Sequence, residues 1–74
     1  MIQELAKIVL TTDLPEYSLK QGDIGTVVLV HQGGQGYEVE FVTLDGETVA
    51  VVSLFANQLR AIGRREIAQA RVMA

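Results

Sequence analysis

The sequence contains no cysteine and no tryptophan, only one proline and only one histidine. Without cysteine the chain can form neither a disulfide nor a thiolate metal site, so its fold has to be held by an apolar core. Aromatic residues make up only 5% of the chain, whereas hydrophobic residues make up 49% and include ten valines. A core of β-branched aliphatic side chains is typical of strands.

Long apolar runs are absent too. No stretch approaches the roughly 20 apolar residues that a membrane-spanning helix needs, and the first residues lack the basic and apolar regions of a signal peptide. We therefore expect a cytoplasmic protein without membrane contact. A chain of 74 residues is long enough for one domain.

Charge is distributed unevenly along the chain. Residues 1–59 carry two lysines against eight acidic residues, a net charge of −6. Residues 60–74 carry four arginines against one glutamate, a net charge of +3. An acidic body with a basic C-terminal tail favours binding of a partner over catalysis.

Short apolar runs separated by turn residues predict an all-β chain. Residues 37–41 alternate apolar and acidic side chains, as in a strand with one solvated face, and Asp45-Gly46 predicts a tight turn. Between the first two strands we expect a loop, with Tyr17 and Leu19 pointing inward, and residues 54–58 predict one helical turn. The predicted strands are residues 4–11, 24–31, 37–41, 48–53 and 59–62.

Five short strands joined by tight connections favour a closed barrel, because an open sheet would leave its edges exposed. The predicted fold is therefore a small five-stranded SH3-like barrel over residues 1–62. Residues 63–74 are rich in helix formers and lack proline, so they predict a basic tail that is either helical or frayed.

The segment Gly22-Asp23-Ile24-Gly25 invites comparison with a phosphate-binding loop. Such a loop needs backbone amides at a helix N-terminus or a nest, whereas these glycines lead into a predicted strand and have an acidic residue between them. We interpret Gly22 as a turn residue with unusual φ and Gly25 as a point of close approach by another strand.

Several separated motifs carry a resemblance to a known family. They are D-L-P-E-x-x-L-x-x-G-D-x-G-T-V-V at 13–28, Y-E-V-E-F at 37–41, D-G-E-T at 45–48 and N-Q-L-R at 57–60. In this order they resemble a family of small bacterial proteins of unknown function, over roughly residues 5–62. The resemblance implies an SH3-like barrel without established activity, and a gene arrangement like that of an antitoxin beside its toxin.

A second resemblance concerns nucleic acid. The motif G-D-x-G-T-V is similar to the glycine-containing turn of KOW modules, which share the barrel and often contact RNA. An RNA-binding module that uses the basic tail is therefore the alternative hypothesis. The acidic body opposes it, because phosphate contacts require cationic density.

Catalytic and cofactor sites are not predicted. His31 has no serine and carboxylate partner in a recognisable arrangement, and Glu38 and Glu40 share one wet strand face with nothing to separate their pKa values. The acids of the 13–23 loop match no known calcium loop. We expect no enzyme activity, no metal, no cofactor and no small-molecule substrate.

A protein partner is the function that the pattern favours. Residues 48–55 are apolar on both strand faces, so either Val49 and Val51 or Ala50 and Val52 form an exposed apolar strip, unless the tail covers it within the same chain. The acidic strand could also cover a basic surface. We expect a homo-oligomer or a complex with another small protein. The predicted partner-binding residues are Glu38, Glu40, Val49, Val51, Arg64, Arg65 and Arg71.

Overall fold

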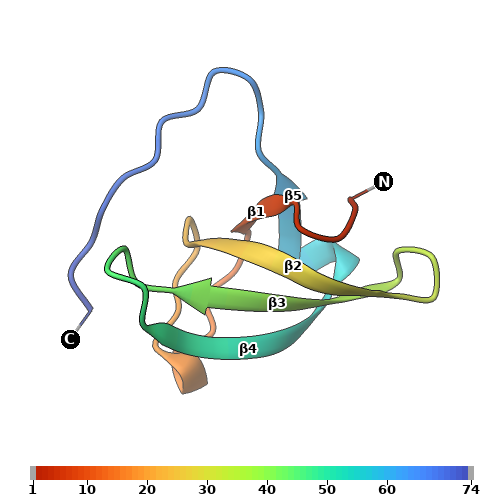
Figure 1. Ribbon diagram of the computed structural model, residues 1–74, viewed down its shortest axis with the longest axis horizontal. Helices are drawn as coiled ribbons and strands as arrows, with labels where there is room; N and C mark the ends of the chain where they lie inside the picture. The colour runs from red at the N-terminus through yellow and green to blue at the C-terminus, as the bar shows by residue number, and fades with distance from the viewer. Residues whose placement is uncertain (1, 74) are drawn as a thin grey trace.

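The computed structural model describes residues 2–73 and confirms an all-β chain. Its five antiparallel strands form one sheet in the order β4-β3-β2-β1-β5 (Figure 1). Two single-turn 3-10 helices connect them: η1 after β1, and η2 between β4 and β5. The elements are β1 Lys7–Leu10, η1 Pro15–Tyr17, β2 Ile24–His31, β3 Gly36–Val42, β4 Thr48–Phe55, η2 Ala56–Gln58 and β5 Leu59–Ala61.

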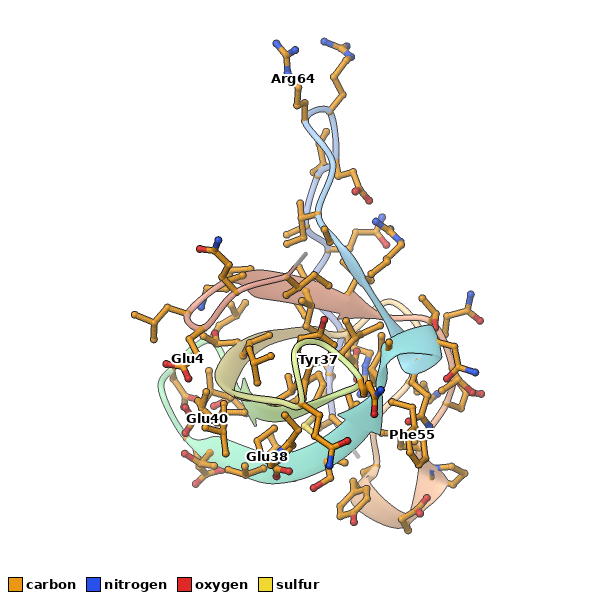
Figure 2. All side chains as sticks on the ribbon, turned by 90° about the vertical axis from the view of Figure 1, so that its right-hand side faces the viewer. Glu4, Tyr37, Glu38, Glu40, Phe55 and Arg64 are labelled. Atoms are coloured by element: carbon orange, nitrogen blue, oxygen red, sulfur yellow. The ribbon has the colours of Figure 1, made fainter. Side chains whose placement is uncertain are left out.

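The sheet curls around its buried side chains, with Tyr37 inside the curve (Figure 2). Its two edges are β4 and β5, and no strand pairing between them closes the sheet within residues 2–73. The predicted closed barrel is thus not formed. The reason is the route of the chain: η2 follows β4 directly, and the three-residue β5 then pairs with β1 on the opposite side of the sheet.

The core is aliphatic, as the composition predicts. Ile8, Leu10, Val27 and Val39 are almost completely buried, and aromatic rings add only Tyr37 and Phe41. Within residues 2–73, all buried apolar residues lie between Ile8 and Leu59, in the five strands and the β1–β2 loop.

The loop between β1 and β2 places one of its two expected anchors inside. Leu19 is buried and forms an isolated β-bridge with Leu14, which closes the loop on itself. Tyr17 ends η1 between these two residues and is 41% exposed, so its predicted inward position is wrong. The bridge brings the two leucines to the core and leaves the single helical turn on the outside.

Two β-bulges change which side chains share a face. In β2 the pair Val27–Val39 is followed by Leu29–Glu38, so Val28 is an extra residue. In β4 the partner of Val42 is Thr48, and the partner of Phe41 is Ala50, which leaves Val49 as the extra residue. A bulge shifts the alternation of side chains between the two sides of the sheet.

The predicted helical tail is absent. Within residues 62–73 the structure has no helix or strand; the segment rises from β5, bends away from the sheet and returns beside the β3–β4 turn (Figure 1). Arg60 donates two hydrogen bonds to Glu66, of 2.8 and 2.7 Å, and the amide of Gly63 donates to the same carboxylate. Side-chain bonds of this kind compete with the weak helical tendency of a short segment.

In the described part of the chain, no helix has the length and apolar character needed to cross a membrane.

Candidate functional site

One side of the sheet brings acidic and apolar side chains together. Because directly paired residues of antiparallel strands point to the same side, Leu29 and Ser53 flank Glu38, and Val51 lies beside Glu40. Phe55, two residues beyond Ser53, continues this side along β4. We call this surface the outer face, formed by Leu29, Glu38, Glu40, Val51, Ser53 and Phe55. Figure 2 labels its residues Glu38, Glu40 and Phe55.

The two glutamates of the outer face are held by neighbouring side chains. Glu38 accepts hydrogen bonds from the Ser53 hydroxyl and from His31, whose Nε2 lies 2.8 Å from the carboxylate. The bond from Ser53, and next the bond with His31, lower the pKa of Glu38 below its ordinary value. Glu40 accepts a bond of 3.1 Å from the Thr48 hydroxyl. A lowered pKa keeps Glu38 ionised, so this face presents a fixed negative charge.

Large apolar side chains border this charge. Phe55 is 72% exposed, Val51 55% and Leu29 44%. Val52, by contrast, is buried in the core. Of the predicted strip, Val51 therefore points outward. Alternate residues of β4 after Val51 point the same way, as far as Phe55.

The free edge of β4 adjoins the outer face. The amide of Phe55 donates to Oε1 of Gln58 at 2.8 Å, so it points away from β3. The backbone groups of Val51 and Ser53 have the same orientation, since alternate residues of an antiparallel strand face the same neighbour. Among residues 2–73 the backbone groups of Val51 and Ser53 that point away from β3 make no hydrogen bond to another backbone group. Strand β4 also lacks the charges and prolines that commonly protect an edge.

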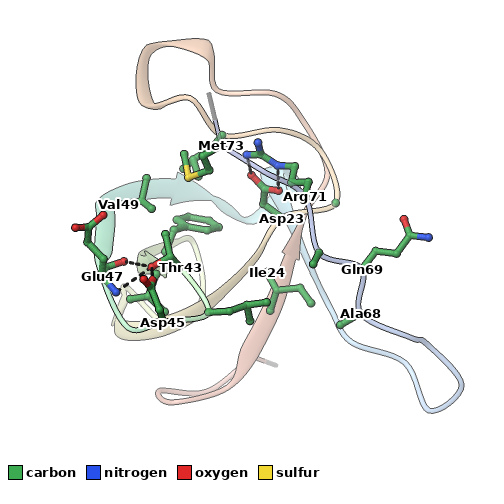
Figure 3. A pocket seen from close by; sticks show the side chains of 16 residues that line it. Asp23, Ile24, Thr43, Asp45, Glu47, Val49, Ala68, Gln69, Arg71 and Met73 are labelled. Carbon is green, nitrogen blue, oxygen red and sulfur yellow. Dashed lines mark hydrogen bonds and ion pairs between the residues drawn. The ribbon is translucent and has the colours of Figure 1, made fainter.

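Two other predicted residues, Val49 and Arg71, lie at a separate place, where the tail meets the sheet. Arg71 donates from Nε and Nη2 to the two carboxylate oxygens of Asp23, at 2.8 and 2.6 Å (Figure 3). Its Nη2 also donates to the carbonyl of Ser18 at 3.0 Å. Val49 is partly buried and lines an open groove of about 730 Å³, together with Met73 of the tail. We call this site the tail groove; it lies between the tail, the start of β2 and the β3–β4 turn.

The ion pair with Arg71 helps to keep Asp23 deprotonated. Burial raises the pKa of this carboxyl, but the hydrogen bonds from Arg71 and from the Lys20 amide lower it more, and the net pKa lies below the ordinary value. Asp23 is therefore an ionised anchor for a guanidinium group.

Arg64 and Arg65 occupy a third place. Both are exposed in the bend of the tail, far from the sheet, where Figure 2 labels Arg64. The seven predicted residues thus divide among the outer face, the tail groove and the tail bend. The tail covers the groove beside Val49 and not the exposed Val51, so it hides only part of the predicted apolar strip.

Sequence reasoning missed four residues of these sites: Leu29, Ser53 and Phe55 of the outer face, and Asp23 as an anchor. Phe55 follows Val51 at a spacing of four and could have been found by extending the strand alternation. The Val28 bulge hides Leu29, because it shifts the alternation within an apolar run. Asp23 gave no signal, since its partner Arg71 lies 48 residues away.

No cluster of three or more histidine, cysteine, aspartate or glutamate side chains suited to a metal ion occurs in residues 2–73.

Comparisons with known proteins support one assignment. No curated protein matches the chain, and no solved structure matches it. A family model described as "Domain of unknown function (DUF4926)" matches residues 4–61, which include all five strands and the whole outer face. The tail lies outside the matched region. The chain belongs to this family, the DUF4926 domains of unknown function.

Proposed function

We propose that this protein is a non-enzymatic interaction module that binds another small protein, or a second copy of itself, through the outer face and the adjoining β4 edge. One observation carries the proposal: two fixed carboxylates, Glu38 and Glu40, lie among exposed apolar side chains beside an unprotected strand edge. Exposed apolar side chains gathered around an ordered polar pair are typical of an interface.

We further propose that the fold is of the SH3-like type and acts in the bacterial cytoplasm. The support for this fold is the placement of β5 beside β1 and the 3-10 turn between β4 and β5. A curved sheet of this kind offers its outer side to partners while its inner side is filled by the core.

The chemistry of the outer face defines the partner. Glu38 and Glu40 attract lysine or arginine and steer a basic surface toward the sheet, as in a toxin and its antitoxin. Val51 and Phe55 require apolar contact at the centre of the same interface. A basic partner with a small apolar patch, or an extended strand that pairs with β4, meets both conditions.

Light scattering tests whether the partner is a second copy. The mass of the wild-type chain is compared with that of Val51→Lys, and Ile67→Lys is the control because Ile67 is 93% exposed in the tail bend. A dimer that only Val51→Lys converts to a monomer assigns self-association to this surface. A dimer unaffected by Val51→Lys contradicts the outer face as its interface. A monomeric wild type rules out self-association and leaves another protein as the proposed partner.

Nucleic-acid binding through the tail is the weaker candidate. Of the four C-terminal arginines, Arg60 is paired with Glu66 and Arg71 with Asp23, which leaves Arg64 and Arg65 for phosphate. Retention of the wild-type chain on mixed RNA or DNA at low salt, lost when these two arginines become alanine, would favour it instead.

A further inference from the structure

The tail groove is bounded partly by the family domain and partly by the tail outside that domain. Two of its sides come from the start of β2 and the β3–β4 turn, within the matched region 4–61. Its remaining side is formed by the tail, residues 68–71 and Met73, which runs along it in an extended form (Figure 3). The tail is therefore an example of the kind of segment that the start of β2 and the β3–β4 turn accept.

The groove recognises arginine by geometry. Asp23 is fixed before any guanidinium arrives, because the amide of Lys20 donates to its Oδ2 at 2.8 Å within the turn. Both carboxylate oxygens then accept from Arg71, and the carbonyl of Ser18 accepts a third bond. Lysine cannot reproduce such a forked set of donors. The aspartate side chain is 17% exposed and that of the arginine 34%, so this pair is shielded from solvent better than an ordinary surface pair.

The apolar part of the groove is not filled by the tail. Met73, two residues beyond Arg71, points toward Val49 and an aromatic ring in Figure 3. Other apolar lining residues stay accessible: Leu44 is 94% exposed and Val42 46%. A longer or bulkier extended segment would make contacts that the tail leaves unused.

We propose that the tail groove binds an extended peptide segment of a partner protein that carries an arginine followed, two positions later, by an apolar residue. In the free molecule the chain's own Arg71 and Met73 form one side of the groove, and the partner segment takes their place. This site is separate from the outer face and does not depend on the function proposed for that face. A tethered tail competes at an effective concentration in the millimolar range, so it sets a threshold that an incoming segment has to exceed.

A peptide titration of the full-length chain tests this proposal. The probe is the capped synthetic peptide EIAQARVM, the sequence of residues 66–73, and amide NMR signals of Asp23, Ile24 and Leu44 report binding. In the variant Arg71→Ala the tail loses its anchor while the groove stays intact. We expect the peptide to bind this variant and to bind the wild type about tenfold more weakly, because the wild-type tail competes.

The contact between the peptide arginine and Asp23 can be removed by a change in the peptide or by a change in the protein. A peptide with alanine in place of its arginine, and the double variant Asp23→Asn with Arg71→Ala, are each expected to weaken binding about tenfold or more. Glu4→Gln with Arg71→Ala is the matched control, since it also removes one carboxylate charge but Glu4 is exposed and does not line the groove. That control should bind as Arg71→Ala does. The alanine peptide leaves Asp23 unchanged, so the test stands even if the aspartate variant folds poorly.

Three results would overturn the proposal. One is equal binding of the arginine and alanine peptides. Another is the absence of any shift in Arg71→Ala at several millimolar peptide, the range in which a tethered segment operates. The third is a set of shifts centred on Val51 and Phe55, which would place the peptide on the outer face.

Discussion

At the scale of single residues, Gly25 shows how little room the curved sheet leaves. A Cβ at this position would lie 2.6 Å from Cγ1 of Val39 and 2.8 Å from Cε1 of Phe41, although the backbone is ordinary strand. There is a close approach at Gly25, but it is made by core side chains of β3 and not, as predicted, by the passage of another strand. Gly22 differs, because its φ of +98° is what the turn requires and the space around it is open.

The Gly25→Ala variant should lower the free energy of unfolding by about 1–3 kcal/mol, since the added methyl group displaces two buried side chains. Urea unfolding measures the loss. Gly36→Ala is the matched control: its added Cβ would meet neighbours only at 3.6 Å or more, so its loss should be clearly smaller. Equal losses in the two variants would contradict the packing argument.

Asp23 makes a second prediction at this scale. Its folded-state pKa is lowered below 3.8, so the stability that its ion pair adds is present above this value and is lost as pH falls through the lowered pKa. In Arg71→Ala the two contributions from Arg71 vanish, and the pKa of Asp23 should rise. An NMR titration of the carboxyl measures this shift. An unchanged pKa would mean that Arg71 and Asp23 do not form their ion pair in solution.

At the scale of elements, strands were predictable where residue patterns are local. Residues 24–31 are a strand with the predicted ends, and the turn at Asp45-Gly46 and the helical turn before β5 also agree with the sequence. The bulges at Val28 and Val49 were not predictable, because a run of valines gives no sign of where the alternation shifts. Because of the bulge in β4, Val51 is exposed on the outer face whereas Val49 lines the tail groove.

The tail is the element on which sequence and structure differ most. Its residues favour a helix, but Glu66 is engaged by Arg60 and by the Gly63 amide, which together hold its pKa at about 2. Helical propensity in so short a segment amounts to a few tenths of a kcal/mol per residue, so specific side-chain contacts override it.

A chain that ends at Gly63 should therefore still fold. Among residues 2–73 every buried apolar residue lies between Ile8 and Leu59, and the deletion removes two partly exposed ion pairs and the contact of Met73. Because exposed ion pairs add little to stability, we expect only a small decrease in the midpoint of urea unfolding, with no loss of helical signal in far-ultraviolet circular dichroism. An unfolded truncated chain, or one that loses a helical signal, would contradict this description of the tail.

At the scale of the whole molecule, the sequence revealed the class of fold and the position of its acidic face, but not how distant segments meet. Alternation in residues 37–41 placed Glu38 and Glu40 on one wet side without knowledge of their neighbours. The sheet curl that joins β5 to β1, and the 48-residue separation between Asp23 and Arg71, depend on contacts that no local pattern records. The sum of charges therefore suggested a basic tail available to a partner, whereas Arg71 of the tail is paired with Asp23, and Arg60 of β5 is paired with Glu66.

The outer face is the surface that we propose for contact with a protein partner. A photo-reactive residue, benzoylphenylalanine, in place of Val51 tests this contact in living cells, with the same residue in place of Ile67 as control. We predict a specific cross-linked product, with another small protein or a second copy, from position 51 alone, and its loss when Glu38 and Glu40 are replaced by lysine. No product from position 51, or the same products from both positions, would contradict the claim.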